Sequence, residues 1–247
     1  MAYRNPVLKE VICTFLFEDG KVSDGNLLDL ASTVKNSGFP EVESGQEMAI
    51  TQVTQDNGIP KGVAVQASFQ PMMLLKCWSE DKKSVVQMTR YRVTVNFAGE
   101  YPGWDNFSNL FKKIYELFKP VQMDQHVREV NLETIDEFKG SSQYVIGEYL
   151  NCNGKFVPSF YKDVKTASDI NIGSGYVHTD GKNIGLNFKI RYTENELIAA
   201  VHSTFKLKLT KPEDAIKTLE SLHEQSTEVF NDWTTVRVKN EVMGGVK

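Results

Sequence analysis

The sequence has few of the side chains that bind metals or form disulfides. It contains three cysteines in 247 residues, Cys13, Cys77 and Cys152. This is an odd number at wide spacing, and two of the three lie in apolar runs, so we expect reduced core residues. The four histidines show no ligand spacing such as His-x-x-x-His: His126, His178, His202 and His223. We therefore expect neither a bound metal nor another cofactor.

Motifs of several enzyme classes are also missing. The sequence has no Gly-x-Ser-x-Gly segment, which argues against a hydrolase of the nucleophile-elbow type. The glycine-rich run 172–176 lacks the Gly-Lys-Ser ending of a phosphate-binding loop, so its glycines indicate a bend or bulge. We therefore expect a protein that is not an enzyme. The alternative is an enzyme with a nonstandard site near His178 or near His223, which has Glu220 one turn away.

Long apolar runs and an excess of positive charge are absent too. No stretch approaches the ~20 apolar residues of a membrane helix, and residues 1–6 lack the apolar run of a signal peptide, so we expect a soluble, cytoplasmic protein with no membrane partner. The net charge at pH 7 is −4. Because affinity for DNA comes mostly from lysine and arginine, we do not expect double-stranded DNA as a partner. The sequence leaves the oligomeric state open.

The most clearly specified element is an amphipathic helix at 104–118. Its large apolar residues recur at spacings of three and four: Trp104, Phe107, Phe111, Ile114 and Phe118. Pro102 and Gly103 prevent an earlier start, and Pro120 prevents continuation. We predict structural roles for this segment and for two aromatic residues of the last helix: Tyr101, Pro102, Gly103, Trp104, Phe107, Phe230 and Trp233.

The order of predicted elements repeats along the chain. The first half reads as a strand at 7–17, a helix from Asp24, strands at 48–54, 63–69, 72–78 and 84–97, and the helix at 104–118. The second half reads as a strand at 127–135, a short helical piece at 143–150, strands at 155–161, 170–178, 183–192 and 197–209, and a final helix from Thr210.

This repetition predicts an α+β fold of two tandem β-α-β(4)-α modules, 1–122 and 123–247. Each module would be an antiparallel sheet with a long helix across one face. The sequence leaves open whether the two sheets join edge to edge and whether 236–247 packs on the body. A chance match of element order is the alternative, because the residues themselves show no clear repeat.

Alternation along the predicted strands places basic side chains on the sheet faces opposite the helices. These residues are Arg90, Arg92, Lys189, Arg191, Lys206 and Lys208. We predict that this basic surface binds an acidic partner, which is a protein surface, a nucleotide or RNA. Charge complementarity would steer the encounter and set the register. The alternative is a solvated sheet face whose lysines discourage edge pairing.

Three segments carry residues that resemble a known family. They are Asn5-Pro6 with Glu10-Val11, then Tyr101-Pro102-Gly103-Trp104 with Phe107, and Leu222-His223 with Phe230. Together they resemble a sporadically distributed, functionally uncharacterised bacterial family whose members are about as long as this chain. The family usually has a Val-x-Arg-x-Gly-Leu-Arg-Tyr-x-Asn strand after the central helix. Here 127–136 keeps Arg128 and lacks the second arginine, the glycine and the tyrosine.

The resemblance implies no reaction, because the family has no established one. Its patchy distribution suggests phage-defence or toxin–antitoxin loci. We therefore expect a non-catalytic binding or regulatory protein that acts through protein–protein contacts, with a partner such as the product of a neighbouring gene. A second expectation is a small-ligand or nucleotide-binding protein that uses the concavity between a curved sheet and its long helix.

Overall fold

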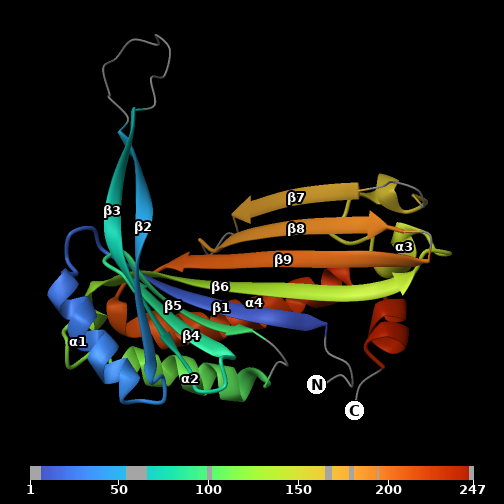
Figure 1. Cartoon of the computed structure of the whole chain (residues 1–247). Coiled ribbons are helices and arrows are strands. Elements are labelled where there is room, and N and C mark those ends of the chain that lie inside the picture. The colour runs from blue at the N-terminus through green and yellow to red at the C-terminus, as the bar shows by residue number, and fades with distance from the viewer. Residues whose placement is uncertain are drawn as a thin grey trace, which may run out of the picture.

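The structure, a computed structural model, describes residues 7–53, 66–98, 102–164, 169–177, 181–193 and 195–244. Its strands are β1 (Leu8–Phe17), β2 (Glu41–Val53), β3 (Gln66–Trp78), β4 (Ser84–Thr89), β5 (Arg92–Ala98), β6 (Val127–Ser141), β7 (Asp169–Val177), β8 (Asn183–Tyr192) and β9 (Glu196–Lys208). Within these residues they form one antiparallel sheet in the order β2-β3-β4-β5-β1-β6-β9-β8-β7 (Figure 1). Tyr101 and His178, both singled out from the sequence, lie outside the described ranges.

The α-helices among the described residues are α1 (Asp24–Lys35), α2 (Trp104–Glu116), α3 (Ile146–Tyr149) and α4 (Ala215–Trp233). Short 3₁₀ turns occupy Asp124–His126, Ser159–Tyr161 and Pro212–Asp214, and a π-helical turn occupies Val238–Val242. α2 begins at Trp104 as predicted. Gly103 precedes it with a φ of +90°, which few other residues adopt, and its carbonyl accepts a hydrogen bond from the Phe107 N–H at 3.1 Å. None of the described helices is both long and apolar enough to cross a membrane.

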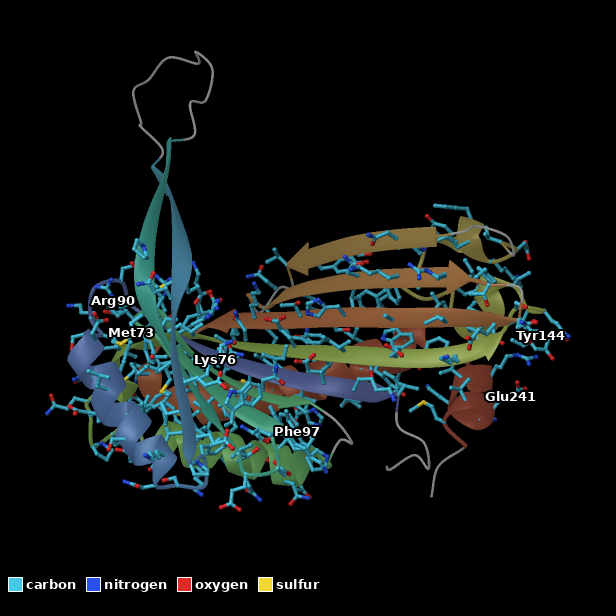
Figure 2. All side chains as sticks on the ribbon, in the orientation of Figure 1. Met73, Lys76, Arg90, Phe97, Tyr144 and Glu241 are labelled. Carbon is cyan, nitrogen blue, oxygen red and sulfur yellow. The ribbon has the colours of Figure 1, made fainter. Side chains whose placement is uncertain are left out.

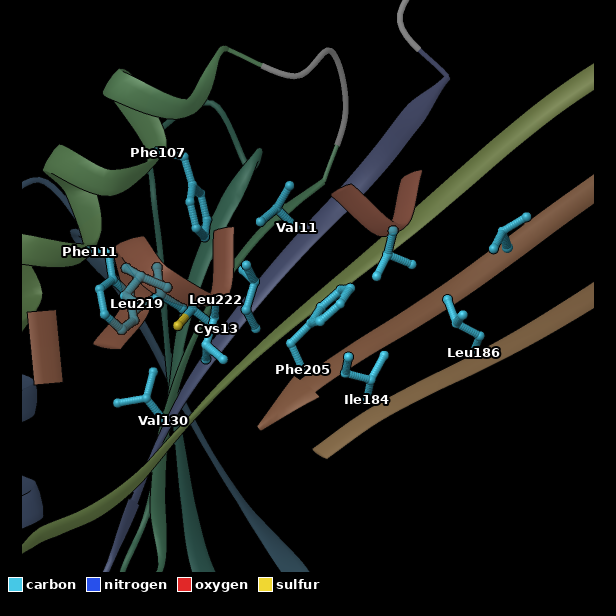
Figure 3. Close-up of a cluster of buried hydrophobic side chains, with 14 of the residues drawn as sticks. Val11, Cys13, Phe107, Phe111, Val130, Ile184, Leu186, Phe205, Leu219 and Leu222 are labelled. Atoms are coloured by element: carbon cyan, nitrogen blue, oxygen red, sulfur yellow. The ribbon is translucent and has the colours of Figure 1, made fainter. Parts of the chain in front are cut away.

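A single row of buried side chains crosses the helical side of the sheet. Strand register places these residues next to one another on β3, β4, β5, β1, β6, β9 and β8: Cys77, Val86, Val95, Cys13, Leu132, Phe205 and Ile184. The α2 side chain Phe111 stacks on Phe15 of β1, with ring centroids 4.1 Å apart, and α4 lies over β6 and β9. Figure 3 shows side chains from β1, β6, β8 and β9 and from both helices meeting in this shared core.

The prediction of two tandem β-α-β(4)-α modules, each an antiparallel sheet with its own long helix across one face, is wrong. β1 and β6, the first strands of the two halves, pair from Leu8↔Asp136 to Phe17↔Val127 and join both halves into one sheet. With β5 on its other edge, β1 has hydrogen-bonding partners on both sides. The described part of the second half also has one strand fewer than predicted, because 155–161 forms bends that lead into a 3₁₀ segment. The predicted boundary at 122/123 falls in the connection from α2 to β6.

The stretch 84–97, predicted as one strand, is a hairpin. β4 ends at Thr89 and β5 starts at Arg92, and these two residues pair across a turn made by Arg90 and Tyr91. The turn changes which residues share a face. Met88 pairs with Val93, so both are buried on the helical side, whereas an unbroken strand would have pointed them to opposite faces.

β2 and β3 form a long hairpin that rises away from the other strands (Figure 1). They pair from Glu41↔Trp78 to Val53↔Gln66, whereas β4 pairs with β3 only between Leu75 and Trp78. Pro71, which falls between the predicted strands 63–69 and 72–78, is inside β3 at a point where β4 does not reach. A strand tolerates proline where it lacks a second neighbour.

Candidate functional site

A cavity of about 770 Å³ lies on the helical side of the sheet, where β1, β6 and β9 form the floor and α2 and α4 form the walls. Its apolar and aromatic lining includes Val7, Leu8, Val11, Pro102, Trp104, Leu132, Phe230 and Met243. Its polar lining includes Asp105, Asn106, Thr134, Asp136, Ser203, His223, Ser226 and Thr227. Small-molecule sites typically have volumes of about 300–1,000 Å³ and combine apolar walls with a few polar groups. The cavity has the size and lining of such a site.

The side chain of Trp104 joins the two helical walls. Its indole stacks on the His223 ring with centroids 3.6 Å apart and planes 8° apart, and its Nε1–H donates to Glu220 Oε2 at 2.8 Å. Lys112 Nζ lies 2.9 Å from the other oxygen of the Glu220 carboxylate. The first turn of α2 is thereby fixed to the middle of α4, which holds this end of the cavity in place.

Electrostatics around this joint favour a neutral imidazole and an ionised carboxylate. Burial lowers the pKa of His223, although Glu220 and Asp105 act in the opposite direction. At Glu220 burial opposes ionisation, but the hydrogen bonds from Lys112 and Trp104 outweigh it and lower the pKa of this carboxyl. His223 is therefore neutral at pH 7 and presents a ring without charge to the cavity.

Asp136 is the most unusual group of the cavity floor. It lies on β6 on the same face as Leu132 and Phe138, where alternation calls for an apolar residue, and it is only 5% exposed. Burial raises the pKa of its carboxyl to about 7. The carboxyl forms no hydrogen bond or ion pair with any residue that the structure describes. Because no described residue hydrogen-bonds to it or pairs with it, ionisation of this buried carboxyl is costly.

Two hydroxyl groups lie next to Asp136 on the floor. Ser203 of β9 is the register partner of Thr134, which is two residues before Asp136 on β6. Both hydroxyls line the cavity, and neither has a hydrogen bond to another described residue. The floor therefore offers one carboxyl and two hydroxyls to whatever occupies the cavity.

The six predicted partner-binding residues do not form one patch. Arg90 lies in the β4–β5 turn beside α1, at the end of the molecule opposite Tyr144 (Figure 2), and its Nε is 3.4 Å from Asp24 Oδ1. Arg92 Nη2 lies 2.6 Å from Glu47 Oε1 of β2. These two arginines already have acidic partners within the chain.

The other four basic residues lie on the sheet face that no described helix covers, at two separate places. Lys206 and Lys208 lie near the end of β9, with Glu129 of β6 paired to Lys208. Lys189 and Arg191 lie toward the far end of β8. Lys189 pairs with Ala200, six residues before Lys206, which corresponds to about 20 Å along a strand.

The predicted structural residues border the cavity or pack behind it. Pro102, Gly103, Trp104 and Phe230 line it, and Phe107 and Trp233 are buried in the core. His223, which the enzyme alternative singled out, also lines it. Sequence reasoning missed Asp136 because it ended the strand at residue 135. An acidic residue in line with the apolar positions of β6 was the signal that could have revealed it.

The remaining observations do not extend this list of candidate sites. Among the residues that the structure describes, no group of three or more His, Cys, Asp or Glu side chains is placed to hold a metal ion. Comparisons with models of protein families, with curated proteins and with solved structures find no match. The resemblance to the bacterial family stays a prediction, and the geometry of the cavity carries the functional interpretation.

Proposed function

We propose that the protein binds a small organic molecule in the cavity between α2, α4 and the sheet. The observation that carries this proposal is the buried carboxyl of Asp136, which opens onto a cavity of about 770 Å³ and has no partner among the described residues. The proposal matches the second expectation from the sequence, a ligand held in the concavity between sheet and helix.

Two features of the cavity support binding. A hydrogen bond from a ligand to the Asp136 carboxyl would contribute about 0.5–1.5 kcal/mol net, and about 1.5–3 kcal/mol when one of the two groups is charged. The apolar walls provide area to bury, and polar groups fix the orientation. The Trp104 contacts to His223 and Glu220 hold the helical wall before the ligand arrives, which lowers the entropic cost of binding.

A cavity-filling substitution tests the proposal. Ser226 lies on α4 and lines the cavity, and Glu228, two residues on, is exposed and does not line it. Ligand-observed NMR with a fragment library should identify molecules that bind the wild type and the Glu228→Phe control but not Ser226→Phe. If every fragment binds Ser226→Phe as well as it binds the wild type, the cavity is not the binding site. Chemical conversion of a bound fragment would favour the enzyme alternative near His223.

A second candidate function is the binding of an acidic partner protein. It is supported by Lys189, Arg191, Lys206 and Lys208, which lie on the uncovered face of β8 and β9. The phage-defence or toxin–antitoxin setting and the partner from a neighbouring gene rest on the family resemblance, and the cytoplasmic location rests on the sequence.

A further inference from the structure

We infer that the ligand carries a primary ammonium group and that the carboxylate of Asp136 holds it. The inference rests on the proposed function and names the chemistry of its ligand. Three observations on the cavity support it: the register of β1 against β6, the charges of the lining, and the hydroxyl groups beside the carboxyl.

A bulge in β1 removes the nearest lysine from Asp136. The pairs Val11↔Thr134 and Glu10↔Ile135 set a register that, if continued, would place Lys9 opposite Asp136. The register shifts at this point, Leu8 pairs with Asp136, and Lys9 is exposed. β-bulges redirect side chains in this way. The strand thus places an apolar side chain where an internal cation would have neutralised the carboxyl.

Within the part of the chain that the structure describes, no other element packed around Asp136 supplies a cation. β9 contributes Val201 and Ser203, and α4 contributes His223, whose pKa is lowered by burial, together with hydroxyl and apolar side chains. Among the described residues, the lining contains no lysine or arginine, and its second carboxyl belongs to Asp105 at the start of α2. The charge of the lining therefore favours a positively charged occupant.

The floor also matches the three donors of an ammonium group. Residues paired directly across strands have Cβ atoms about 4.5–5.5 Å apart. Thr134 and Ser203 form such a pair, and Asp136 adjoins them on the same face. The Asp136 carboxylate and the two hydroxyl oxygens are acceptors that an ammonium group can use together. The apolar lining accommodates the rest of a hydrophobic amine.

Three probes of similar shape test the inference by calorimetric titration of the full chain: benzylamine, benzyl alcohol and benzoate. Benzylamine should bind the wild type at least tenfold more tightly than either of the others. Asp136→Asn should remove this preference, whereas Glu228→Gln, at an exposed position that does not line the cavity, should retain it. Leu8→Lys, which supplies an internal ammonium opposite Asp136, should weaken benzylamine binding at least tenfold.

The number of protons released when the amine binds gives an independent test of the inference. Because Asp136 titrates near 7, ammonium binding should release about half a proton at pH 7, and benzylamine affinity should rise about tenfold between pH 6 and pH 8. Proton release is measured by repeating the titration in two buffers of different ionisation enthalpy. Proton uptake would mean that a protonated Asp136 donates to a neutral acceptor, and it would overturn the inference.

The outcomes separate this inference from the proposed function. Suppose that benzyl alcohol binds, that Ser226→Phe abolishes this binding, and that benzylamine binds no more tightly than benzyl alcohol. The ammonium inference would then be wrong, and the cavity would still be the binding site. If Ser226→Phe changes the binding of none of the three probes, both the ammonium inference and the proposed function are wrong. Thermal denaturation of Asp136→Asn and Leu8→Lys shows whether each variant is folded. The inference is also wrong if folded Asp136→Asn binds benzylamine as tightly as the wild type.

Discussion

The indole of Trp104 and the imidazole of His223 lie face to face, with ring centroids 3.6 Å apart, and connect the start of α2 to the middle of α4. The contact joins two segments that are more than a hundred residues apart in the chain. It also forms one end of the cavity, since both side chains line it. The stability of the fold and the binding of a ligand should therefore both depend on the side chain of Trp104.

The first prediction concerns the hydrogen bond of Trp104. Trp104→Phe keeps an aromatic ring against His223 but removes the donor to Glu220, and should lower the free energy of unfolding by about 1 kcal/mol. Lys112→Met removes only a half-exposed ion pair to the same carboxylate and should cost less than about 1 kcal/mol. Urea denaturation measures both. A larger loss for Lys112→Met than for Trp104→Phe would contradict the assigned role of the indole.

The second prediction concerns the pH dependence of stability. The pKa of Asp136 is about 7 in the folded protein against an ordinary value of 3.8, so folding favours the protonated carboxyl. Stability from this group is present below pH 4 and is lost as the pH rises through 7. With about 1.4 kcal/mol for each unit, the wild type should lose roughly 4 kcal/mol relative to Asp136→Asn between pH 4 and pH 8. Urea denaturation of both proteins at several pH values measures the difference; parallel pH curves would contradict it.

The third prediction concerns two glycines in different surroundings. A Cβ on Gly147 would lie 2.6 Å from the backbone carbonyl oxygen of Lys162, whereas nothing lies within 4 Å of a Cβ on Gly173 in β7. Gly147→Ala should therefore destabilise the protein by about 1–3 kcal/mol through overpacking. Gly173→Ala should be neutral or stabilising by up to about 1 kcal/mol. The two midpoints of thermal unfolding test this; a similar effect at both positions would show that the loop before Lys162 packs differently.

The fourth prediction concerns the basic residues on the uncovered sheet face. If Lys206 and Lys208 contact an acidic partner protein, the Lys206→Glu/Lys208→Glu variant should lose that protein in affinity purification from cells that carry the neighbouring genes. Lys211→Glu/Lys217→Glu changes the net charge equally at exposed positions around the start of α4 and serves as the control. An unchanged set of co-purifying proteins in the first variant would remove the support for this surface.

Local patterns in the sequence predicted the positions of helices and strands better than they predicted which strands pair with each other. The apolar stripe from Trp104 and the alternation at 183–192 correspond to α2 and β8, because both depend on neighbouring residues. The pairing of β1 with β6 depends on residues more than a hundred positions apart, and alternation specifies faces without specifying partners. The Arg90–Tyr91 turn was missed because it contains none of the residues that usually mark turns.

The candidate site was only partly predictable for related reasons. The sequence pointed to the segment Pro102–Trp104 and to His223, which border the cavity, but it gave no sign that they meet. Asp136 lies just beyond the predicted strand end. The bulge that replaces Lys9 with Leu8 opposite Asp136 arises from the pairing of two distant strands, so neither strand reveals it alone.

The side-chain carboxyl of Asp136, followed by NMR through a pH titration with and without benzylamine, tests the ligand site most directly. We expect a midpoint near 7 in the free protein and a downward shift of at least one unit when the amine is bound. A midpoint near 4 in the free protein, or one near 7 that saturating benzylamine leaves unchanged, would contradict the assignment of Asp136 as the residue that holds the ligand.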